Sequence, residues 1–137
     1  MAKLRHLAFV CDDPKKVAAF LSKAFDVEIL YEHDQASVLS DGEVNFTLLT
    51  REFLKHDAVP WHFGFEVSQE ELEAKRPLLK ELGAEIHDGV RDGRPVEAFT
   101  YTPEGHRIDM APFWPTKKGQ SRRQQEYRNW EKEPAKS

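Results

Sequence analysis

The chain has 137 residues, a formal net charge of −4, 32% charged residues and 39% hydrophobic residues. This size and balance suit one compact domain and exclude two independent ones, and a single cysteine, Cys11, excludes an internal disulfide or a cysteine-based zinc site. Because no run of about 18 apolar residues exists and the first residues lack a signal peptide's apolar stretch, we expect a cytoplasmic protein without a membrane span.

The first half of the chain predicts a strand, a helix and three further strands. Residues Leu4–Val10 alternate in the way typical of a half-buried strand. An Asp-Asp-Pro start and apolar residues at three- and four-residue spacing then predict a helix over 14–25. Three strand-like runs follow, at Val27–Tyr31, Ala36–Leu39 and Glu43–Thr50, and an Asp-Gly turn joins the last two.

The second half repeats this order. Trp61–Val67 predicts a strand, and Ser68 with a glutamate three residues later predicts the capped start of a helix that ends at Gly83. Three more strands are predicted at Ala84–Ile86, Val96–Tyr101 and Arg107–Ala111. The sequence therefore predicts an α+β domain over 1–116, built from two tandem βαβββ modules at 4–50 and 60–112.

Charge is unevenly distributed between this domain and the end of the chain. Residues 117–137 contain seven Lys or Arg against three Glu, a net charge of +4, which leaves about −8 on 1–116. The acidic body argues against nucleic acid as a partner. We expect 117–137 to form a basic, partly ordered tail, because Tyr127 and Trp130 would otherwise be exposed aromatics.

Strand parity places three potential ligands on one face of the predicted sheet. His6 and His62 occupy equivalent places in the repeat, 56 residues apart, and Asp109 lies on the same face by parity. We expect helices to cover the opposite, bulkier face, so that these side chains line a cavity. Two imidazoles and a carboxylate form the facial triad that holds a divalent metal and leaves one side open. A single half-buried histidine is usually structural, and the equivalence of the two favours the metal site.

Parity and aromatic content suggest further site residues. Glu66 shares a face with His62 and is a candidate general base, and Tyr101 is a candidate proton or hydrogen-bond donor, with packing as the alternative role. The candidate substrate-binding residues are Asn45, Thr47, Phe99 and Trp114. The other histidines, which fall in predicted turns or at strand ends and are expected at the surface, are His33, His56, His87 and His106.

Three segments carry a family resemblance: HLAFVCDDP with AAFLSKAFDVEI, HFGFEVS with LKELGAEI, and FTYTPEGHRIDM. They span about 4–112 and resemble the vicinal oxygen chelate superfamily, which includes glyoxalase I, bleomycin resistance proteins, fosfomycin resistance enzymes, methylmalonyl-CoA epimerase and extradiol dioxygenases. The resemblance implies a cupped, barrel-like mixed sheet with helices outside, metal ligands at His6, His62 and Asp109, and a homodimer.

The sequence departs from the family pattern in three places. The turn before the last strand begins with Thr102 where the pattern has aspartate. Asp109 stands where a glutamate is expected, so its carboxylate would sit about one methylene further from the metal. The fourth strand offers Asn45 and Thr47 where glyoxalase-type members commonly have a glutamate ligand. The resemblance thus argues against a lactoylglutathione lyase of the usual pattern and favours the three-ligand dioxygenase, fosfomycin and epimerase branches.

Two functions of different classes follow. The first is a metal-dependent enzyme of dioxygenase, lyase or epimerase type, in which a divalent ion (Fe, Mn, Zn, Ni or Mg) chelates two neighbouring oxygens of a small substrate. The alternative is a metal-free binding protein, like the bleomycin-sequestering members, that captures a flat or hydrophobic ligand through Phe99, Tyr101 and Trp114. Metal content and sensitivity to a chelator separate the two.

Overall fold

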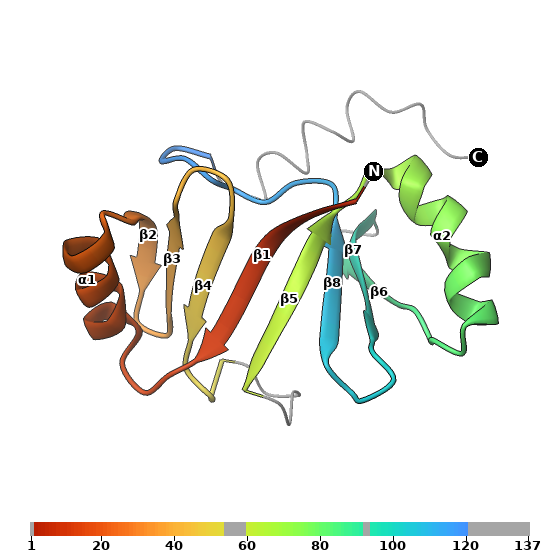
Figure 1. The fold of residues 1–137 in the computed structure, drawn as a ribbon, viewed down its shortest axis with the longest axis horizontal. Helices are drawn as coiled ribbons and strands as arrows, with labels where there is room; N and C mark the ends of the chain where they lie inside the picture. The colour runs from red at the N-terminus through yellow and green to blue at the C-terminus, as the bar shows by residue number, and fades with distance from the viewer. Residues whose placement is uncertain (1, 54–59, 92–93, 121–137) are drawn as a thin grey trace.

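The computed structural model describes residues 2–53, 60–91 and 94–120. In these ranges, eight strands form one open, curved sheet of order β2-β3-β4-β1-β5-β8-β7-β6, accompanied by two helices (Figure 1). The elements are β1 (Lys3–Val10), α1 (Pro14–Phe25), β2 (Glu28–His33), β3 (Ala36–Ser40), β4 (Asn45–Leu49), β5 (Trp61–Glu66), α2 (Gln69–Glu81), β6 (His87–Arg91), β7 (Arg94–Tyr101) and β8 (Arg107–Ala111). The predicted α+β class is confirmed. The predicted tail beyond Gln120 and His56 lie outside the described residues.

The two equivalent strands β1 and β5 lie side by side in the middle of the sheet (Figure 1). They pair antiparallel, with His6 opposite Gly64 and Ala8 opposite His62. Since His62 and Gly64 are the repeats of His6 and Ala8, exchanging the two modules leaves this register unchanged. Strand β4 runs parallel to β1, and β8 runs parallel to β5. The pairing is therefore that of a pseudo-twofold axis between the repeats.

Helix α1 packs on the outer face of the first half of the sheet. Its N-terminus is capped by Asp13, whose side chain accepts a hydrogen bond from the Lys16 amide at 3.2 Å. Buried Ala18 packs against Leu39 of β3 and Leu48 of β4. This small helix residue allows the helix to approach the strands closely.

Helix α2 packs on the other half. Ser68 and Glu71 form a capping box at its N-terminus, and Leu72 is buried against Val67, Ala98 and Met110. The strand predicted at Ala84–Ile86 is wrong. Gly83 adopts a φ of +86° and the Ala84 amide bonds to the Leu79 carbonyl, so these residues complete the helix exit, and strand pairing starts only at His87.

The helices leave part of the outer face uncovered. We expected a helix over the bulky residues of each module, but Figure 1 shows α1 and α2 at opposite ends of the sheet. Leu4 and Phe9 of β1 and Trp61 of β5 are 45%, 41% and 37% exposed. The expectation is wrong for these three residues, whereas Phe65 of β5 and the following Val67 pack with Leu72 of α2 as expected.

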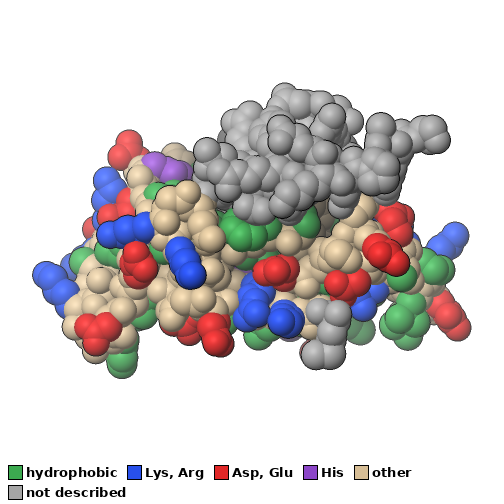
Figure 2. All heavy atoms as spheres, turned by 90° about the horizontal axis from the view of Figure 1, so that it is seen from above, with side chains coloured by type: hydrophobic (Ala, Val, Ile, Leu, Met, Phe, Trp, Pro, Cys, Tyr) green, Lys and Arg blue, Asp and Glu red, His purple; other side chains and the backbone are tan. Residues whose placement is uncertain are grey.

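Both signs of charge are mixed on the face shown in Figure 2, where described Lys and Arg side chains lie among Asp and Glu side chains. Within the described ranges, neither helix is both long enough and apolar enough to span a bilayer.

Candidate metal centre

His6, Gly64 and Asp109 form one row across three neighbouring strands. His6 of β1 pairs with Gly64 of β5, and Gly64 pairs with Asp109 of β8. Directly paired residues project from the same face of a sheet, and His62, two residues before Gly64, projects from it as well. The two imidazoles and the carboxylate thus converge above a glycine, which has no side chain to occupy the space between them.

This convergence depends on the glycine. A Cβ at Gly64 would lie 2.9 Å from Trp114 Cζ2, 3.0 Å from the Asp109 carbonyl oxygen and 3.2 Å from His6 Cβ. Two of these contacts involve a backbone atom or an atom adjacent to the backbone, which cannot move aside by a side-chain rotation. Any larger residue would therefore push apart the elements that carry the ligands.

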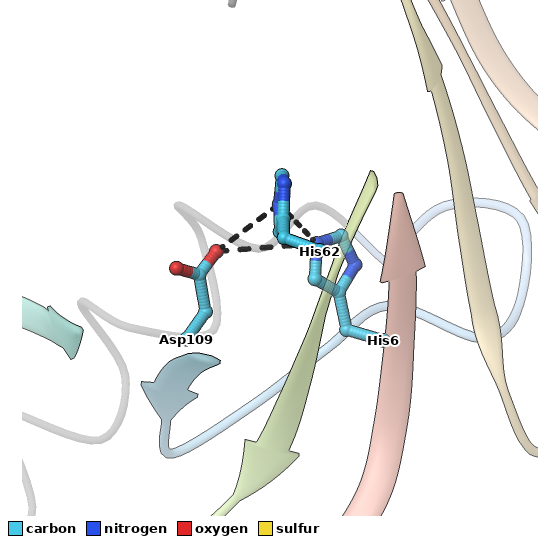
Figure 3. Close-up of side chains that lie close together, drawn as sticks. All are labelled: His6, His62 and Asp109. Carbon is cyan, nitrogen blue, oxygen red and sulfur yellow. Dashed lines mark hydrogen bonds and ion pairs between the residues drawn. The ribbon is translucent and has the colours of Figure 1, made fainter. Parts of the chain in front are cut away.

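The three side chains are close together and buried (Figure 3). His6 Nε2 lies 3.3 Å from His62 Nε2, and Asp109 Oδ2 lies 3.4 Å from His62 Nε2 and 4.0 Å from His6 Nε2. Each residue offers a ligand atom within 4.8 Å of the other two. Tetrahedral ligands at about 2.0–2.1 Å from a metal are about 3.3–3.4 Å apart, so these separations suit three ligands on one side of an ion.

The electrostatics of the cluster also fit a cation. Burial raises the pKa of the Asp109 carboxyl, and the charge of Glu97 raises it further, against the opposing effects of Arg107 and His62. Two neutral imidazole nitrogens that face each other at 3.3 Å repel unless a proton or a cation lies between them. A divalent ion would remove this repulsion and stabilise the buried carboxylate, so the donor set fits such an ion.

Neighbouring side chains orient the ligands. Arg107 Nε donates a hydrogen bond to Asp109 Oδ1 at 2.7 Å, so that Oδ2 faces the imidazoles. The Arg107 guanidinium in turn lies 3.9 Å from the centre of the Phe99 ring. His6 Nδ1 lies 3.0 Å from Asn45 Oδ1, within hydrogen-bond distance, and the His6 ring stacks on Trp114 with centroids 3.9 Å apart.

A cavity of about 260 Å³ opens beside this cluster. Most of its walls come from the first module. Its lining residues are His6, Tyr31, His33, Ala36, Val38, Asn45, Thr47, Leu49, Phe53, His62, Arg107, Asp109, Trp114 and Pro115. Small substrates fit such a volume, since pockets for drug-sized ligands measure about 300–1,000 Å³.

The structure brings most of the predicted site residues to this cavity. The three predicted ligands line it, together with Asn45, Thr47 and Trp114, although Asn45 and Trp114 are only 2% and 3% exposed. Their burial makes them supports of the site more than contact points for a substrate. The prediction that all these residues share one face agrees with their positions.

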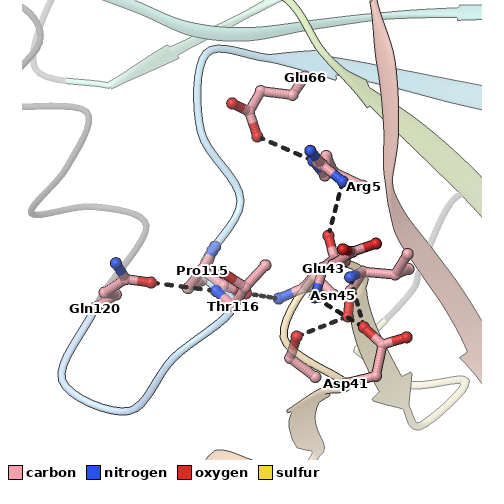
Figure 4. Close-up of polar contacts among 10 residues, drawn as sticks. Arg5, Asp41, Glu43, Asn45, Glu66, Pro115, Thr116 and Gln120 are labelled. Carbon is pink, nitrogen blue, oxygen red and sulfur yellow. Dashed lines mark hydrogen bonds and ion pairs between the residues drawn. The ribbon is translucent and has the colours of Figure 1, made fainter.

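The other three candidates, Glu66, Tyr101 and Phe99, are not among the residues that line the cavity. Glu66, at the far end of β5, has its carboxylate 3.8 Å from Arg5 Nε (Figure 4). Tyr101 contacts His87 and Phe99 edge-on, and Phe99 itself lies against the Arg107 guanidinium. Phe99 pairs with Asp109, and Tyr101 pairs with Arg107, so both lie on the predicted face beside residues of the cavity without lining it themselves.

Sequence reasoning missed several residues of the cavity. Arg107 could have been found, because it lies two residues before Asp109 and shares its face. His33 is exposed, as expected, but it also lines the cavity, together with the exposed Tyr31 and Phe53. The curvature of the sheet brings the edge strand β2 to the site, and no local sequence signal reports this. His106, in contrast, stacks on Trp61 with centroids 4.7 Å apart, away from the cavity.

Comparisons with known proteins agree with this architecture. The family model described as Glyoxalase/Bleomycin resistance protein/Dioxygenase superfamily matches residues 3–110. No curated protein sequence gives a significant match.

Three solved structures illustrate the fold similarity. A superfamily member from Vibrio splendidus 12B01 has a TM-score of 0.56 at 15% identity and aligns over 80% of this chain and 97% of its own. Methylmalonyl-CoA epimerase from Mycobacterium tuberculosis has a TM-score of 0.57 at 16% identity, over 82% and 88% of the two chains. An extradiol ring-cleaving dioxygenase from B. fuscum reaches 0.61 at 18% identity, over 93% of this chain but 36% of the longer enzyme.

Proposed function

Since the chain belongs to the glyoxalase/bleomycin resistance protein/dioxygenase superfamily, we propose that it is a metal-dependent enzyme in which His6, His62 and Asp109 hold a divalent ion. Its substrate would be a small molecule with two neighbouring oxygens. The observation that carries this proposal is the convergence of three buried ligand atoms within 4.8 Å beside an open cavity.

The protein's own residues prepare the site for an ion and a substrate. Once bound, a divalent ion would supply Lewis-acid polarisation of the two substrate oxygens. His6 and His62 direct Nε2 atoms to the site, and Asp109 contributes one negative charge through Oδ2. Arg107 holds Oδ1 of the same carboxylate, so that Oδ2 is the oxygen directed at the imidazoles and would be the one to hold the ion. The cavity beside them receives the substrate.

The register of the repeat supports a three-ligand site. Thr47 pairs with Ala8, as Asp109 pairs with Gly64, so Thr47 occupies the place in the first module that Asp109 has in the second. A threonine hydroxyl is a weak ligand, and that of Thr47 donates to Asn45 Oδ1 at 2.9 Å. This favours dioxygenase or epimerase chemistry over a lyase with a fourth carboxylate ligand. Two imidazoles favour Fe, Zn or Ni over Mg.

The alternative of a metal-free binding protein has less support. It requires Phe99, Tyr101 and Trp114 to line one cleft. Phe99 lies against Arg107, Tyr101 is not among the cavity residues, and Trp114 is buried on His6. Phe99, Tyr101 and Trp114 therefore do not line one cleft together. A homodimer and a cytoplasmic location stay predictions.

Metal analysis tests the proposal. Protein purified without chelator should contain close to one equivalent of a divalent metal by elemental analysis, and His62→Ala should contain little. His106→Ala is the matched control, because this histidine lies away from the cavity against Trp61, and it should keep the metal. Absence of metal from the wild-type protein, even after incubation with Fe²⁺, Mn²⁺, Zn²⁺ or Ni²⁺, would refute the proposal. If the protein does bind metal, oxygen uptake with catechols would distinguish a dioxygenase from an epimerase.

A further inference from the structure

Residues 112–120, which we call the C-terminal strap, lie against the metal site although they follow the last residue of the family match. The match ends at residue 110, just before β8 ends. Figure 1 shows the strap running from β8 in the second module back towards the first. Gln120 Oε1 accepts hydrogen bonds from the Thr116 and Lys117 amides at 3.3 and 3.2 Å, which closes the strap on itself (Figure 4).

The strap contacts the site at two places. Trp114 stacks on the His6 ring with centroids 3.9 Å apart and planes 5° apart, which fixes the plane of the imidazole. The Pro115 carbonyl accepts a hydrogen bond from Asn45 Nδ2 at 2.8 Å (Figure 4). Asn45 is 2% exposed and also contacts His6 Nδ1. The strap therefore contacts one predicted ligand, His6, directly through Trp114 and indirectly through Asn45.

The hydrogen-bond chain has one consistent direction. A carbonyl oxygen can only accept, so the Asn45 atom that faces Pro115 is the NH₂ group and the atom that faces His6 is Oδ1. Since Oδ1 can also only accept, His6 Nδ1 carries the proton. Thr47 Oγ1 donates to the second lone pair of the same oxygen. A reversed amide would set two carbonyl oxygens against each other in a buried place, which costs a hydrogen bond.

We propose that Asn45, locked by the carbonyl of Pro115, is a positioning residue that holds His6 in the Nδ1–H tautomer and so presents the Nε2 lone pair to the metal site. The sequence suggested that Asn45 contacts the substrate. We assign it the role of positioning His6 instead. A ligand oriented through its second ring nitrogen is the usual way in which neighbouring groups tune a metal-bound histidine. The consequence for metal binding rests on the proposed function, whereas the tautomer does not.

Nitrogen NMR of the metal-free protein tests the tautomer directly. Long-range ¹H–¹⁵N correlation at alkaline pH, with the signals assigned through His6→Gln, should show His6 protonated at Nδ1. Asn45→Asp loses the donor to the Pro115 carbonyl but keeps an oxygen acceptor facing His6 Nδ1, and it should keep this tautomer, whereas Asn45→Leu, which has no acceptor, should lose it. Thr47→Val is the matched control, because it removes only the second donor to Asn45 Oδ1, and His6 should stay protonated at Nδ1. An Nε2–H tautomer in the wild-type protein would overturn the proposal, even if Asn45→Leu does not fold.

Metal affinity gives a second readout. Competition with a chromophoric chelator for Zn²⁺ should show an affinity about 10- to 100-fold lower in Asn45→Leu than in Thr47→Val. If Asn45→Leu binds Zn²⁺ as tightly as the control and keeps the Nδ1–H tautomer, Asn45 does not position His6. If the wild-type protein binds no metal but shows the Nδ1–H tautomer, the positioning stands and the proposed function fails.

Discussion

Asp109 is a buried acid whose charged form is disfavoured by burial and favoured by a neighbouring arginine. It is 4% exposed, and this burial raises the pKa of its carboxyl. Arg107 at 2.7 Å offsets part of the penalty and also orients the group. Burying the charged Asp109 carboxylate thus destabilises the metal-free protein, and a bound cation would offset this destabilisation.

Replacing Asp109 with Asn should therefore stabilise the metal-free protein at neutral pH. Because the folded pKa of Asp109 lies above the value of 3.8 for the free group, the contribution of Asp109 to stability is greatest below pH 3.8 and is lost as the pH rises through the raised folded pKa. The neutral amide does not pay this penalty. Urea unfolding with chelator present, at several pH values, should show Asp109→Asn gaining over the wild type as the pH increases.

Asp41 provides a control of opposite sign. The amides of Val44 and Glu43 donate to Asp41 Oδ1 at 2.8 and 2.9 Å and lower the pKa of this carboxyl. Its stabilising effect is present above pH 3.8 and is lost as the pH falls through the lowered folded pKa. Asp41→Asn should consequently lose stability relative to the wild type as the pH increases. A gain in both variants would contradict the assignment of opposite shifts.

The start of helix α2 is determined by hydrogen bonds between residues close together in the sequence. The Ser68 hydroxyl accepts a hydrogen bond from the Glu71 amide at 3.1 Å, and the Glu71 carboxylate accepts one from the Ser68 amide at 3.3 Å. These bonds satisfy two donors that a helix N-terminus otherwise leaves open. The same signature is readable in the sequence, which is why the start of α2 was predicted correctly.

Removing this cap should weaken the fold without touching the site. Ser68→Ala should lower the free energy of unfolding by about 1 kcal/mol, the usual cost of losing an N-cap side chain. Ser68→Thr keeps the hydroxyl and should lose much less. Urea unfolding measures both, and equal losses in the two variants would show that the hydroxyl does not cap α2. Metal content should be unchanged in either variant.

At the scale of the whole molecule, the two modules are related by symmetry but differ where the strap crosses. Ala8 is the equivalent of Gly64 and carries a Cβ at 1% exposure, so the repeat by itself does not require glycine at this place. At Gly64, Trp114 packs directly upon the glycine and adds the shortest of the three contacts that a Cβ would make. The strap thus makes the site asymmetric and leaves the cavity with walls mainly from the first module.

Gly64→Ala tests this junction. The added methyl group would meet Trp114 Cζ2 at 2.9 Å, so we expect a loss of about 1–3 kcal/mol in the free energy of unfolding, with weaker metal binding. Adding Trp114→Phe should recover part of the stability, because the smaller ring relieves one contact while the Asp109 carbonyl at 3.0 Å stays. If the double variant instead loses the sum of the losses measured for Gly64→Ala and Trp114→Phe alone, Trp114 is not the neighbour that excludes a side chain at position 64.

Periodicity, caps and turns along the chain were enough to predict the repeated βαβββ order, and strand parity was enough to place His6, His62 and Asp109 on one face. These are local properties: a side chain's face follows from alternation, and a helix start follows from a few neighbouring residues. The strand expected at Ala84–Ile86 was wrong because the helix exit competes for the same backbone groups, which is a matter of hydrogen bonds and not of pattern.

Only the tertiary structure decided which residues on this face of the sheet line the cavity and which contacts orient them. Glu66 and Tyr101 have the predicted parity but do not line the cavity, whereas His33 of the edge strand β2 lines it because the sheet curves. The contacts of Asn45 and Trp114 with His6 join residues 39 and 108 positions apart. Such contacts depend on how the strands twist and where the strap returns, and neither is encoded in a local period.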